Sequence, residues 1–479
     1  MKRVSVSMML RMDTAENKGK PHIAVIGAGI TGLSAAHRLV ELGGVDVEIF
    51  EAGPEPGGLL KTEHHGDHLI ECGADSFITN KPAALDLCLR LGLESELIQT
   101  NEEHRRSLVL RDGKPVPVPR GFQLLMPTQT EPLMQSSILS DAGKQRVLEE
   151  ANIPPKPRLE DESVASFVRR RFGDELFERL AQPMVGGIYT ADPEKLSLLA
   201  TLPRFLHMEQ EHGSLTAAAA ATKQEAASGA RYGLFVSLRR GIGQLTRTLV
   251  ERIEASHTIH RNTPIRAMSG TRTGWLVHPA SSESIEFDGV IVATSAWRAA
   301  DLLREETPDL SSSLGEIEYA SSAVVYTAHR LSDIEHAMDA FGLVIPETEG
   351  RRVLAVSFAS RKFDGRCPDD QIILRSFVGG ALNPLALQHT DDQIVNNTLD
   401  ELASIFGIKG KPLRANVTRY ERAMPQYHLG HVDRVTTIRE QLASIDRLQI
   451  AGNAYDGVGI PDSVRNGETA AEAMAINLH

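Results

Sequence analysis

The sequence predicts an α/β protein, because its beginning alternates strand, helix and strand in the pattern of a parallel sheet. Residues 22–27 (HIAVIG) are mostly apolar and end at a glycine, and apolar residues then recur at helical spacing over residues 31–43. After Gly43 and Gly44, an alternating run over residues 45–50 reaches Glu51 as a second strand. A chain of 479 residues has room for a few packed units. The first is therefore a Rossmann-like βαβ unit.

Three glycines mark the junction between the first strand and the helix, in the pattern Gly27-x-Gly29-x-x-Gly32. In this motif the first glycine allows a tight turn, the second lets the backbone approach a pyrophosphate, and the third lets helix and strand pack closely. The helix N-terminus then offers oriented N–H groups to the anion. Glu51 ends the second strand, where a carboxylate accepts hydrogen bonds from an adenosine ribose. The motif predicts a dinucleotide site and by itself leaves NAD and FAD both open.

The rest of the chain predicts two further units and two returns to the first sheet. Paired-strand signals end in the buried run 290–293, and residues 448–478 follow the order strand, glycine-rich turn, helix. Strands of mostly antiparallel character dominate residues 323–380, and helical spacing dominates residues 162–227. The predicted units are a flexible leader at 1–20, a discontinuous dinucleotide-binding domain at 21–80, 232–297 and 440–479, a mixed-sheet substrate domain at 81–119 and 298–439, and a helical subdomain at 120–231.

Composition excludes other classes of protein. With 51 Lys and Arg against 63 Asp and Glu, the net charge is −12, so the chain lacks the positive surface that nucleic-acid binding requires. Cys72, Cys88 and Cys367 are scattered without CxxC spacing, which predicts neither a disulfide framework nor a zinc site and is typical of a cytoplasmic protein. No run of 18 apolar residues occurs, so no membrane-spanning helix is expected.

The helical region contains an apolar stripe that allows two interpretations. Burial in a core is the simpler one, and a peripheral contact with the inner face of a membrane stays open. Nearby carboxylates such as Asp161 and Glu162 are expected on solvated faces rather than as an acid and base pair. The stripe consists of Leu198, Leu199, Leu202, Phe205 and Leu206.

A second glycine pair, Gly57-Gly58, follows Glu51 too closely to begin another βαβ unit, so it would bring backbone to the same pyrophosphate. The string ECGADSF comes next, at 71–77. With these segments the sequence resembles the two-domain FAD-dependent oxidases and desaturases of the amine oxidase superfamily. More closely, it resembles the protoporphyrinogen oxidase family. The strings that carry this resemblance are GKPVPVPRG at 113–121, QPMVGGIYTADPEKLS at 182–197, FGLVIP at 341–346, FASRKF at 358–363, SFVGGA at 376–381 and AGNAYDGVGIP at 451–461.

The resemblance implies that the cofactor is FAD and that its flavin ring carries the chemistry, so no side chain is assigned a catalytic role. The superfamily often has an arginine after the glycine pair, where this chain has Leu60-Lys61, so positive charge near the pyrophosphate is expected from lysine. The implied FAD contacts are Gly27, Gly29, Thr31, Gly32, Glu51, Ala52, Gly57, Gly58, Leu59, Lys61, Gly73, Ala74, Asp75, Ser76, Ile265, Gly452, Val458, Gly459 and Ile460.

The resemblance also implies residues that contact the substrate. Leu343 and Phe358 match family positions that sandwich a flat macrocycle, and a glycine pair lies near it. Plant-type members bind a propionate with an arginine in the strand before the Gly-Lys turn, and here Ser107 falls at that register. The candidate substrate contacts are Arg106, Ser107, Gly186, Gly187, Leu343 and Phe358.

The implied activity is a six-electron oxidation in heme biosynthesis. It converts protoporphyrinogen IX to protoporphyrin IX, or coproporphyrinogen III to coproporphyrin III, with dioxygen as the acceptor and H₂O₂ as its product. Gly241-x-Gly243 lacks a third glycine and is interpreted as a turn that leads into a helix, so NAD(P)H has no predicted site. A small acceptor is therefore favoured, and a quinone stays open.

Two other functions stay open. A flavin amine oxidase or carotenoid-type desaturase on the same scaffold would need an aromatic pair at the flavin for an amine, and the C-terminal segment offers only Tyr455, in an unsuitable register. A non-catalytic FAD or porphyrin carrier would bind flavin without turnover. No metal site is expected, because His64, His65 and His68 lack a fourth ligand at suitable spacing. The expected partners are a tetrapyrrole and dioxygen, while a homodimer and a ferrochelatase partner stay open.

Overall fold

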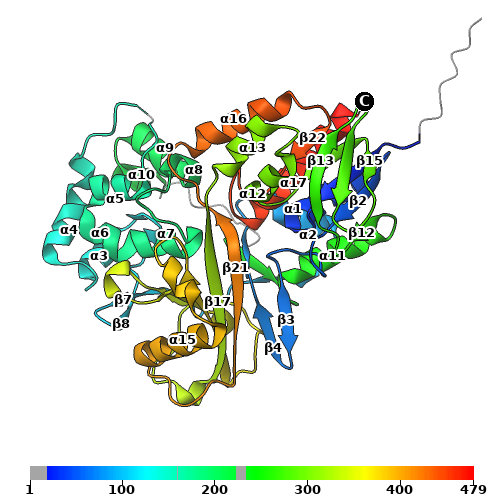
Figure 1. Ribbon diagram of the computed structural model, residues 1–479. Helices are drawn as coiled ribbons and strands as arrows, with labels where there is room; N and C mark the ends of the chain where they lie inside the picture. Colours follow the sequence, from blue (N-terminus) through cyan, green and yellow to red (C-terminus); the bar gives the residue numbers. More distant parts are fainter. Residues whose placement is uncertain (1–18, 159, 223–232, 479) are drawn as a thin grey trace, which may run out of the picture.

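The computed structural model describes residues 19–158, 160–222 and 233–478, so most of the predicted leader lies outside the described residues. Figure 1 shows the elements gathered in three regions. Helices pack around a parallel sheet on the right, short helices cluster on the left, and long strands run below both. The mixed α/β class that the sequence predicts is confirmed.

The region on the right is built on a five-stranded parallel sheet in the order β12-β2-β1-β16-β22. Its strands are β1 (His22–Ile26), β2 (Asp46–Phe50), β12 (Thr258–His260), β16 (Gly289–Val292) and β22 (Leu448–Ile450). The central strand is buried from Ile23 to Ile26, as expected for a sheet covered on both faces. Because β16 and β22 pair with this sheet in parallel, the two predicted returns of the chain are confirmed.

Helices cover one face of the parallel sheet. They are α1 (Ile30–Leu42), α2 (Ala83–Arg90), α11 (Gly243–Glu254) and α17 (Ile460–Asn477). Ile23 and Val25 of β1 pack into the same core as Leu33 and Leu249 of these helices. Helices α1 and α17 approach so closely that a Cβ at Gly467 would overlap the carbonyl oxygen of Thr31. This packing fixes the N-terminus of α1 at the carboxyl end of β1.

The other face of the parallel sheet carries an antiparallel sheet and three helices. Ala24 and Ile26 of β1 pack there with Trp275 and Ile438. The elements on this face are β13 (Ile265–Gly270), β14 (Trp275–Pro279), β15 (Ile285–Phe287), α12 (Ala296–Leu303), α13 (Pro308–Gly315) and α16 (His431–Ala443). A further small sheet has the order β5-β11-β6, from β5 (Phe77–Ile78), β6 (Leu97–Gln99) and β11 (Phe235–Leu238).

The long sheet has seven strands in the order β21-β17-β20-β19-β18-β7-β8. Its strands are β7 (Ser107–Arg111), β8 (Lys114–Pro117), β17 (Tyr319–Arg330), β18 (Gly342–Val344), β19 (Val353–Phe358), β20 (Gln371–Gly379) and β21 (Arg414–Pro425). All neighbours are antiparallel except β7 and β18, which run parallel. The sheet is therefore mixed, as the sequence predicts.

The two faces of the long sheet have different neighbours. Helix α15 (Asp391–Phe406) covers one face, where Leu343 and Phe358 share a core with Leu402 and Phe406. The opposite face is approached by the hairpin β3 (Thr62–His65) and β4 (His68–Glu71) and by the helical region (Figure 1). The short helix α14 (Ala359–Lys362) follows β19.

The helical region consists of short helices around one apolar core. Leu198, Phe205 and Leu206 are 0%, 1% and 3% exposed, so these members of the apolar stripe are core residues. The elements are β9 (Phe122–Gln123), β10 (Met126–Pro127), α3 (Thr130–Gln135), α4 (Asp141–Leu148), α5 (Val164–Phe172), α6 (Asp174–Leu176), the π-helix η3 (Phe177–Ala181), α7 (Gln182–Tyr189), α8 (Leu198–Thr201), α9 (Pro203–His212) and α10 (Leu215–Thr222).

Buried charges stabilise this small core. Arg171 is fully buried, and its Nε donates to Glu150 Oε1 at 2.7 Å while its Nη1 donates to Glu209 Oε1 at 3.2 Å. Burial alone would raise the pKa of Glu150, but hydrogen bonds from Thr216 and Arg171 hold that pKa below its ordinary value. Glu162 is 5% exposed and pairs with Arg170, so the expectation that it lies on a solvated face is wrong.

We predict that E150Q destabilises the protein far more than E194Q. Removing one partner leaves Arg171 buried with too little negative charge, at a cost of about 3–5 kcal/mol. Glu194 pairs with Arg169 at the surface, where losing the pair costs about 1 kcal/mol or less. The urea midpoint of unfolding measures both effects. Equal midpoints for the two variants would contradict the prediction.

Candidate active site

The first glycine turn lies at the carboxyl end of β1. The N–H of Gly27 donates to the carbonyl of Phe50 at 2.9 Å, which ties the turn to β2. Gly27 has a φ of +100°, and a Cβ there would lie 2.6 Å from the carbonyl oxygen of Ala293. A Cβ at Gly32 would overlap the carbonyl oxygen of Gly27. Glycine at both positions is therefore a requirement of the fold.

Gly29 is different, because the space in front of it is open. Its φ of −71° suits any residue, and a Cβ would have no neighbour within 4 Å among the described residues. Gly29 is the N-cap of α1, and no side chain caps the helix there. The first intrahelical bond is donated by Leu33 to Gly29, so the amides before it face outward. This arrangement fits an anion such as a pyrophosphate.

The second glycine segment packs directly on the first. Gly57 N donates to the carbonyl of Ala28 at 2.8 Å, and a Cβ on Gly58 would lie 3.1 Å from the Cα of Gly29. The two backbones therefore meet at one place, as the spacing predicts. Leu59 follows with its side chain 43% exposed. Lys61, from which positive charge was expected, is bound to Glu63 at 2.7 Å.

Glu51 organises the adjoining end of the site. Its carboxylate accepts hydrogen bonds from the N–H of Ala28 at 3.0 Å and of Gly53 at 2.7 Å. Its carbonyl accepts from Thr263 at 2.8 Å, which brings the start of β13 at Ile265 alongside. Ala52 is exposed at this edge. Glu51 therefore lies between the glycine turn and the segment in which the resemblance implies further contacts.

The segment at residues 73–76 is held by two cations, Lys362 at the end of α14 and Arg375 in β20 of the long sheet. Lys362 Nζ donates to Asp75 Oδ1 at 2.8 Å, and Arg375 Nη1 donates to Oδ2 at 3.0 Å. Arg375 also donates to the carbonyl of Gly73, and Ser76 donates to Asp75 at 2.7 Å. Burial alone would raise the pKa of Asp75, but Lys362 and Arg375 hold it well below its usual range. Asp75 is therefore a buried anion that joins two regions, with Ala74 in the loop between.

A second buried carboxylate lies at the start of the same segment. Glu71 is 3% exposed and accepts from Thr62 Oγ1 at 2.6 Å and from the N–H of Ile242 at 2.8 Å. Burial raises the pKa of Glu71, and these bonds and the charge of Arg366 offset part of that effect. The N–H of Gly243, where α11 begins, donates to Thr62. Gly241-x-Gly243 is thus a turn that leads into a helix, as predicted.

The C-terminal loop before α17 is held by Tyr427. The Tyr427 hydroxyl donates to the carbonyl of Asn453 at 2.6 Å and accepts from the N–H of Gly457 at 2.9 Å. Gly452 has a φ of +155° and lies against Thr294, which itself adjoins the first glycine turn. Val458 packs against the helical core, and Gly459 and Ile460 begin α17. The loop therefore lies between the glycine turn and the helical region.

The predicted substrate residues lie in different environments, some in a core and some at the surface. Leu343 and Phe358 are 1% and 0% exposed in the core under α15, which corrects the expectation that their side chains sandwich a macrocycle. The physical reason is strand parity, because neighbouring residues such as Val344 point to the opposite face. Arg106 is bound to Asp339 at 2.7 Å, and Ser107 is exposed at the start of β7.

The glycine pair of α7 faces the long sheet on the side away from α15. A Cβ at Gly187 would lie 3.9 Å from both Ala355 and Val344. Gly186 lines a pocket between α7 and the sheet that has room for about one water molecule. Small residues here let the helix approach the sheet closely. This pocket lies beside the face to which the 73–76 segment is bound.

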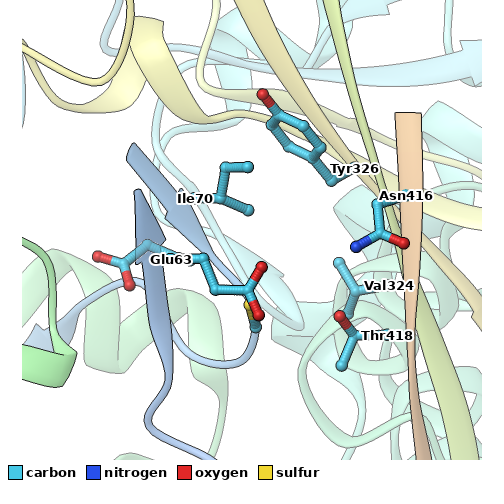
Figure 2. Close-up of a pocket in the computed structure, with 8 residues that line it drawn as sticks. Glu63, Ile70, Val324, Tyr326, Asn416 and Thr418 are labelled. Atoms are coloured by element: carbon cyan, nitrogen blue, oxygen red, sulfur yellow. The ribbon is translucent and has the colours of Figure 1, made fainter. Parts of the chain in front are cut away.

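A second pocket, with room for about one water molecule, lies between the β3–β4 hairpin and strands β17 and β21. Figure 2 shows Glu63 and Ile70 on the hairpin side and Tyr326 and Asn416 on the strands opposite. Ligand pockets usually exceed about 300 Å³ and are mainly apolar. We therefore assign no large substrate to this pocket.

Two of the three histidines after the second glycine pair, His65 and His68, form side-chain hydrogen bonds. His68 contacts Gln371 at 2.7 Å and Tyr326 at 3.0 Å, and His65 contacts Glu63 at 3.0 Å. Over the part of the chain that the structure describes, no group of three or more His, Cys, Asp or Glu could hold a metal ion. The donor set gives no support to a metal centre.

Three residues that hold the site together received no role from the sequence: Lys362, Arg375 and Tyr427. Arg375 is a single cation in the apolar strand QIILRSFVG, which is a signal that a buried carboxylate partner exists. Its partner Asp75 lies 300 residues earlier in the chain. No local pattern identifies that pair.

We predict that G29A folds normally and loses the cofactor. The added methyl group has open space in the protein but lies where an anion would approach the backbone. Purified G29A should keep its thermal midpoint in the absence of added flavin and bind flavin at least roughly tenfold more weakly, a difference of about 1.4 kcal/mol. G32A is the matched control, because its methyl group overlaps the turn and should destabilise the fold. Normal flavin binding by G29A would contradict the prediction.

We predict that D75N destabilises the protein most at neutral pH. Without the carboxylate, the buried Arg375 keeps only the carbonyl of Gly73 as an acceptor on this segment and Lys362 loses its ion pair, at a cost of about 3–5 kcal/mol. Because the folded pKa of Asp75 is depressed, its contribution is complete above the unfolded pKa of about 4 and is lost as the pH falls further. Urea unfolding at several pH values should show wild type and D75N converging below about pH 4. A gap that is constant with pH would contradict this assignment.

Comparisons with known proteins agree with this geometry. The chain matches the family described as flavin containing amine oxidoreductase over residues 30–475. Coproporphyrinogen III oxidase of Bacillus subtilis (strain 168) is 32% identical over 469 residues, which cover 94% of this chain and 97% of that protein. Protoporphyrinogen oxidase 2 of Arabidopsis thaliana is 26% identical over 485 residues, covering 94% and 93%.

The fold also has a solved counterpart. The crystal structure of a protein from Exiguobacterium sp. 255-15 aligns with a TM-score of 0.85 and 27% identity, covering 95% of this chain and 99% of that one. Within residues 19–158, 160–222 and 233–478, no helix has the length and apolar character to cross a membrane. With a family match over residues 30–475 and a 32% identical relative over 94% of its length, the chain belongs to the flavin containing amine oxidoreductase family.

Proposed function

We propose that the protein is an FAD-dependent porphyrinogen oxidase of heme biosynthesis. The observation that carries the proposal is the contact between the two glycine segments, with open space at Gly29 and Glu51 alongside. This arrangement suits the pyrophosphate and ribose of FAD. The relatives named as porphyrinogen oxidases support the reaction.

The proposed FAD site extends across the three segments that meet at the carboxyl end of the parallel sheet. Residues 27–32 and 57–61 would contact the pyrophosphate, Glu51 with Ala52 and Ile265 the adenosine, and residues 73–76 and 452–460 the flavin end. The Lys61 side chain would have to leave Glu63 in order to bind the cofactor. We also propose the three-part domain division given by the sequence, with the sheet of β1 as the cofactor domain.

The chemistry needs few side chains. FAD, when bound, accepts a hydride from a meso carbon of the porphyrinogen. The chain would hold the flat macrocycle against the flavin and exclude water, and α7 and the face of the long sheet opposite α15 are suited to this. Val344 and Ala355 make that face apolar where Gly187 packs on it, so the macrocycle would lie beside this contact.

Coproporphyrinogen III is the substrate that we propose first. The relative named for it is 32% identical, against 26% for the relative named for protoporphyrinogen. The two substrates differ in their carboxylates, since coproporphyrinogen carries four propionates and protoporphyrinogen two. Arg106 and Ser107 are proposed contacts for a propionate, although Arg106 would first have to leave Asp339.

Three rounds of oxidation would remove six electrons, and each would convert one O₂ to H₂O₂. We also propose a cytoplasmic location with a peripheral contact at the inner face of a membrane, a homodimer, and transfer of product to a ferrochelatase. The membrane contact would need residues other than Leu198, Phe205 and Leu206, because these are buried. Partition of the protein between the membrane and supernatant fractions tests that contact.

The alternatives gain no support from the site. An amine oxidase needs aromatic side chains at the flavin, and Tyr455 is 8% exposed and packed in the core between the parallel sheet and α16. A non-catalytic carrier would bind FAD in the same way, so turnover has to decide.

We predict that the purified protein carries FAD and oxidises coproporphyrinogen III faster than protoporphyrinogen IX. Appearance of porphyrin fluorescence measures the oxidation, and H₂O₂ should form at about three molecules per porphyrin under air. Absence of oxidation with both substrates in the FAD-loaded protein would contradict the proposed function. Oxidation without H₂O₂ would contradict dioxygen as the acceptor.

A further inference from the structure

Arg204 is an exposed cation of the helical region that has no acidic partner among the described residues. Other cations near the proposed site do have one, such as Lys81 with Asp462 at 2.7 Å and Arg179 with Glu349 at 3.3 Å. Among the described residues, Arg204 has no carboxylate within 4.0 Å and its side chain forms no hydrogen bond, although its guanidinium carbon lies 4.7 Å from the ring of Phe205.

The local structure makes this cation unfavourable to the fold. Arg204 lies in the first turn of α9, directly after Pro203, and that turn contains no acidic residue. The N-terminus of a helix carries partial positive charge, so a cation there costs about 0.3–1 kcal/mol. The protein around the guanidinium also lowers the pKa of Arg204 through desolvation. An unpaired cation in this position has a simple explanation if an anionic ligand supplies the missing charge.

The neighbours of Arg204 place it beside the proposed substrate space. Tyr189 ends α7, two residues after Gly187, and its hydroxyl donates to the carbonyl of Thr201 at 3.2 Å. Burial raises the pKa of Tyr189, the negative charge of Asp462 raises it further, and the positive charge of Arg204 lowers it. Asp462 lies in the first turn of α17, at the proposed flavin end. Arg204 therefore lies near the junction of α7, α9 and the start of α17.

We propose that Arg204 binds a propionate carboxylate of the substrate. The inference rests on the proposed function for the identity of the ligand, and it adds a carboxylate contact in the helical region to the one proposed at Arg106. The planar guanidinium can donate two parallel hydrogen bonds to a carboxylate, which a lysine cannot do. A substrate with four propionates gains most from such a contact, so Arg204 favours coproporphyrinogen III.

The experiment compares R204Q with R169Q in the FAD-loaded protein. Arg169 is in the same helical region but already has Glu194 and Asp174 as partners, so R169Q makes the same change of charge elsewhere. The ligands are coproporphyrin III and its tetramethyl ester, and porphyrin fluorescence reports binding. We expect R204Q to weaken binding of the acid roughly 10- to 100-fold, as for loss of a hydrogen bond to a charged group. Binding of the ester should not change, and R169Q should bind both like wild type.

Two further measurements separate a substrate contact from a structural role. R204Q should raise KM for coproporphyrinogen III with little change in kcat, and its thermal midpoint should equal or exceed that of wild type. R204K should recover part of the lost affinity. A lowered midpoint in R204Q, or equal loss of affinity for acid and ester, would overturn the proposal.

The outcome for Arg204 is separate from the outcome for the reaction. If wild type binds coproporphyrin III through Arg204 but oxidises neither porphyrinogen, the proposed function fails and the carboxylate contact stands. If wild type oxidises coproporphyrinogen III, and R204Q binds and oxidises it as wild type does, the proposed contact of Arg204 is wrong and the proposed function stands.

Discussion

The contact between two glycine backbones is the constraint on which the rest of the site depends. Gly57 donates to Ala28, and Gly58 lies against Gly29, at the carboxyl end of β1. A side chain at Gly32 or Gly27 would prevent this approach, since each already touches backbone. The parallel sheet supplies the rigid edge, and α1 supplies outward amides above it. No side chain lies in front of Gly29 among the described residues, which leaves space for a cofactor to lie along the two backbones.

A second link joins that corner to the long sheet. Asp75 is bound by Lys362 and Arg375 from the long-sheet region, and Arg375 also binds the carbonyl of Gly73. Breaking a buried pair is costly, because the remaining charge has no solvent to stabilise it. The 73–76 segment is therefore held at a fixed position relative to the sheet. Tyr427 does the same for the 453–457 loop from the side of the helical region.

The sequence predicts the parts of this structure that depend on neighbouring residues. The glycine motif and Glu51 are close in the chain, so a short pattern specifies the turn, the helix and the acidic end of the site. The prediction for Leu343 and Phe358 was wrong because successive side chains of a strand point to opposite faces of the sheet. Matching a family motif does not specify which face a given side chain is on. Asp75 and Arg375 are 300 residues apart. Their pairing depends on tertiary structure, which a single sequence does not specify.

The two proposed ligands pose different electrostatic problems in a chain of net charge −12. A pyrophosphate lies against a fixed corner, so backbone amides and the dipole of α1 can stabilise it without a side-chain cation. This explains how the chain can bind a dinucleotide with Leu59 exposed there and Lys61 bound to Glu63. The propionates of a tetrapyrrole extend from the ring edge on flexible arms. They need side chains that reach outward, and a cation already bound to a carboxylate contributes little. Arg204 has no acidic partner among the described residues, so its guanidinium is free to bind a carboxylate of the substrate.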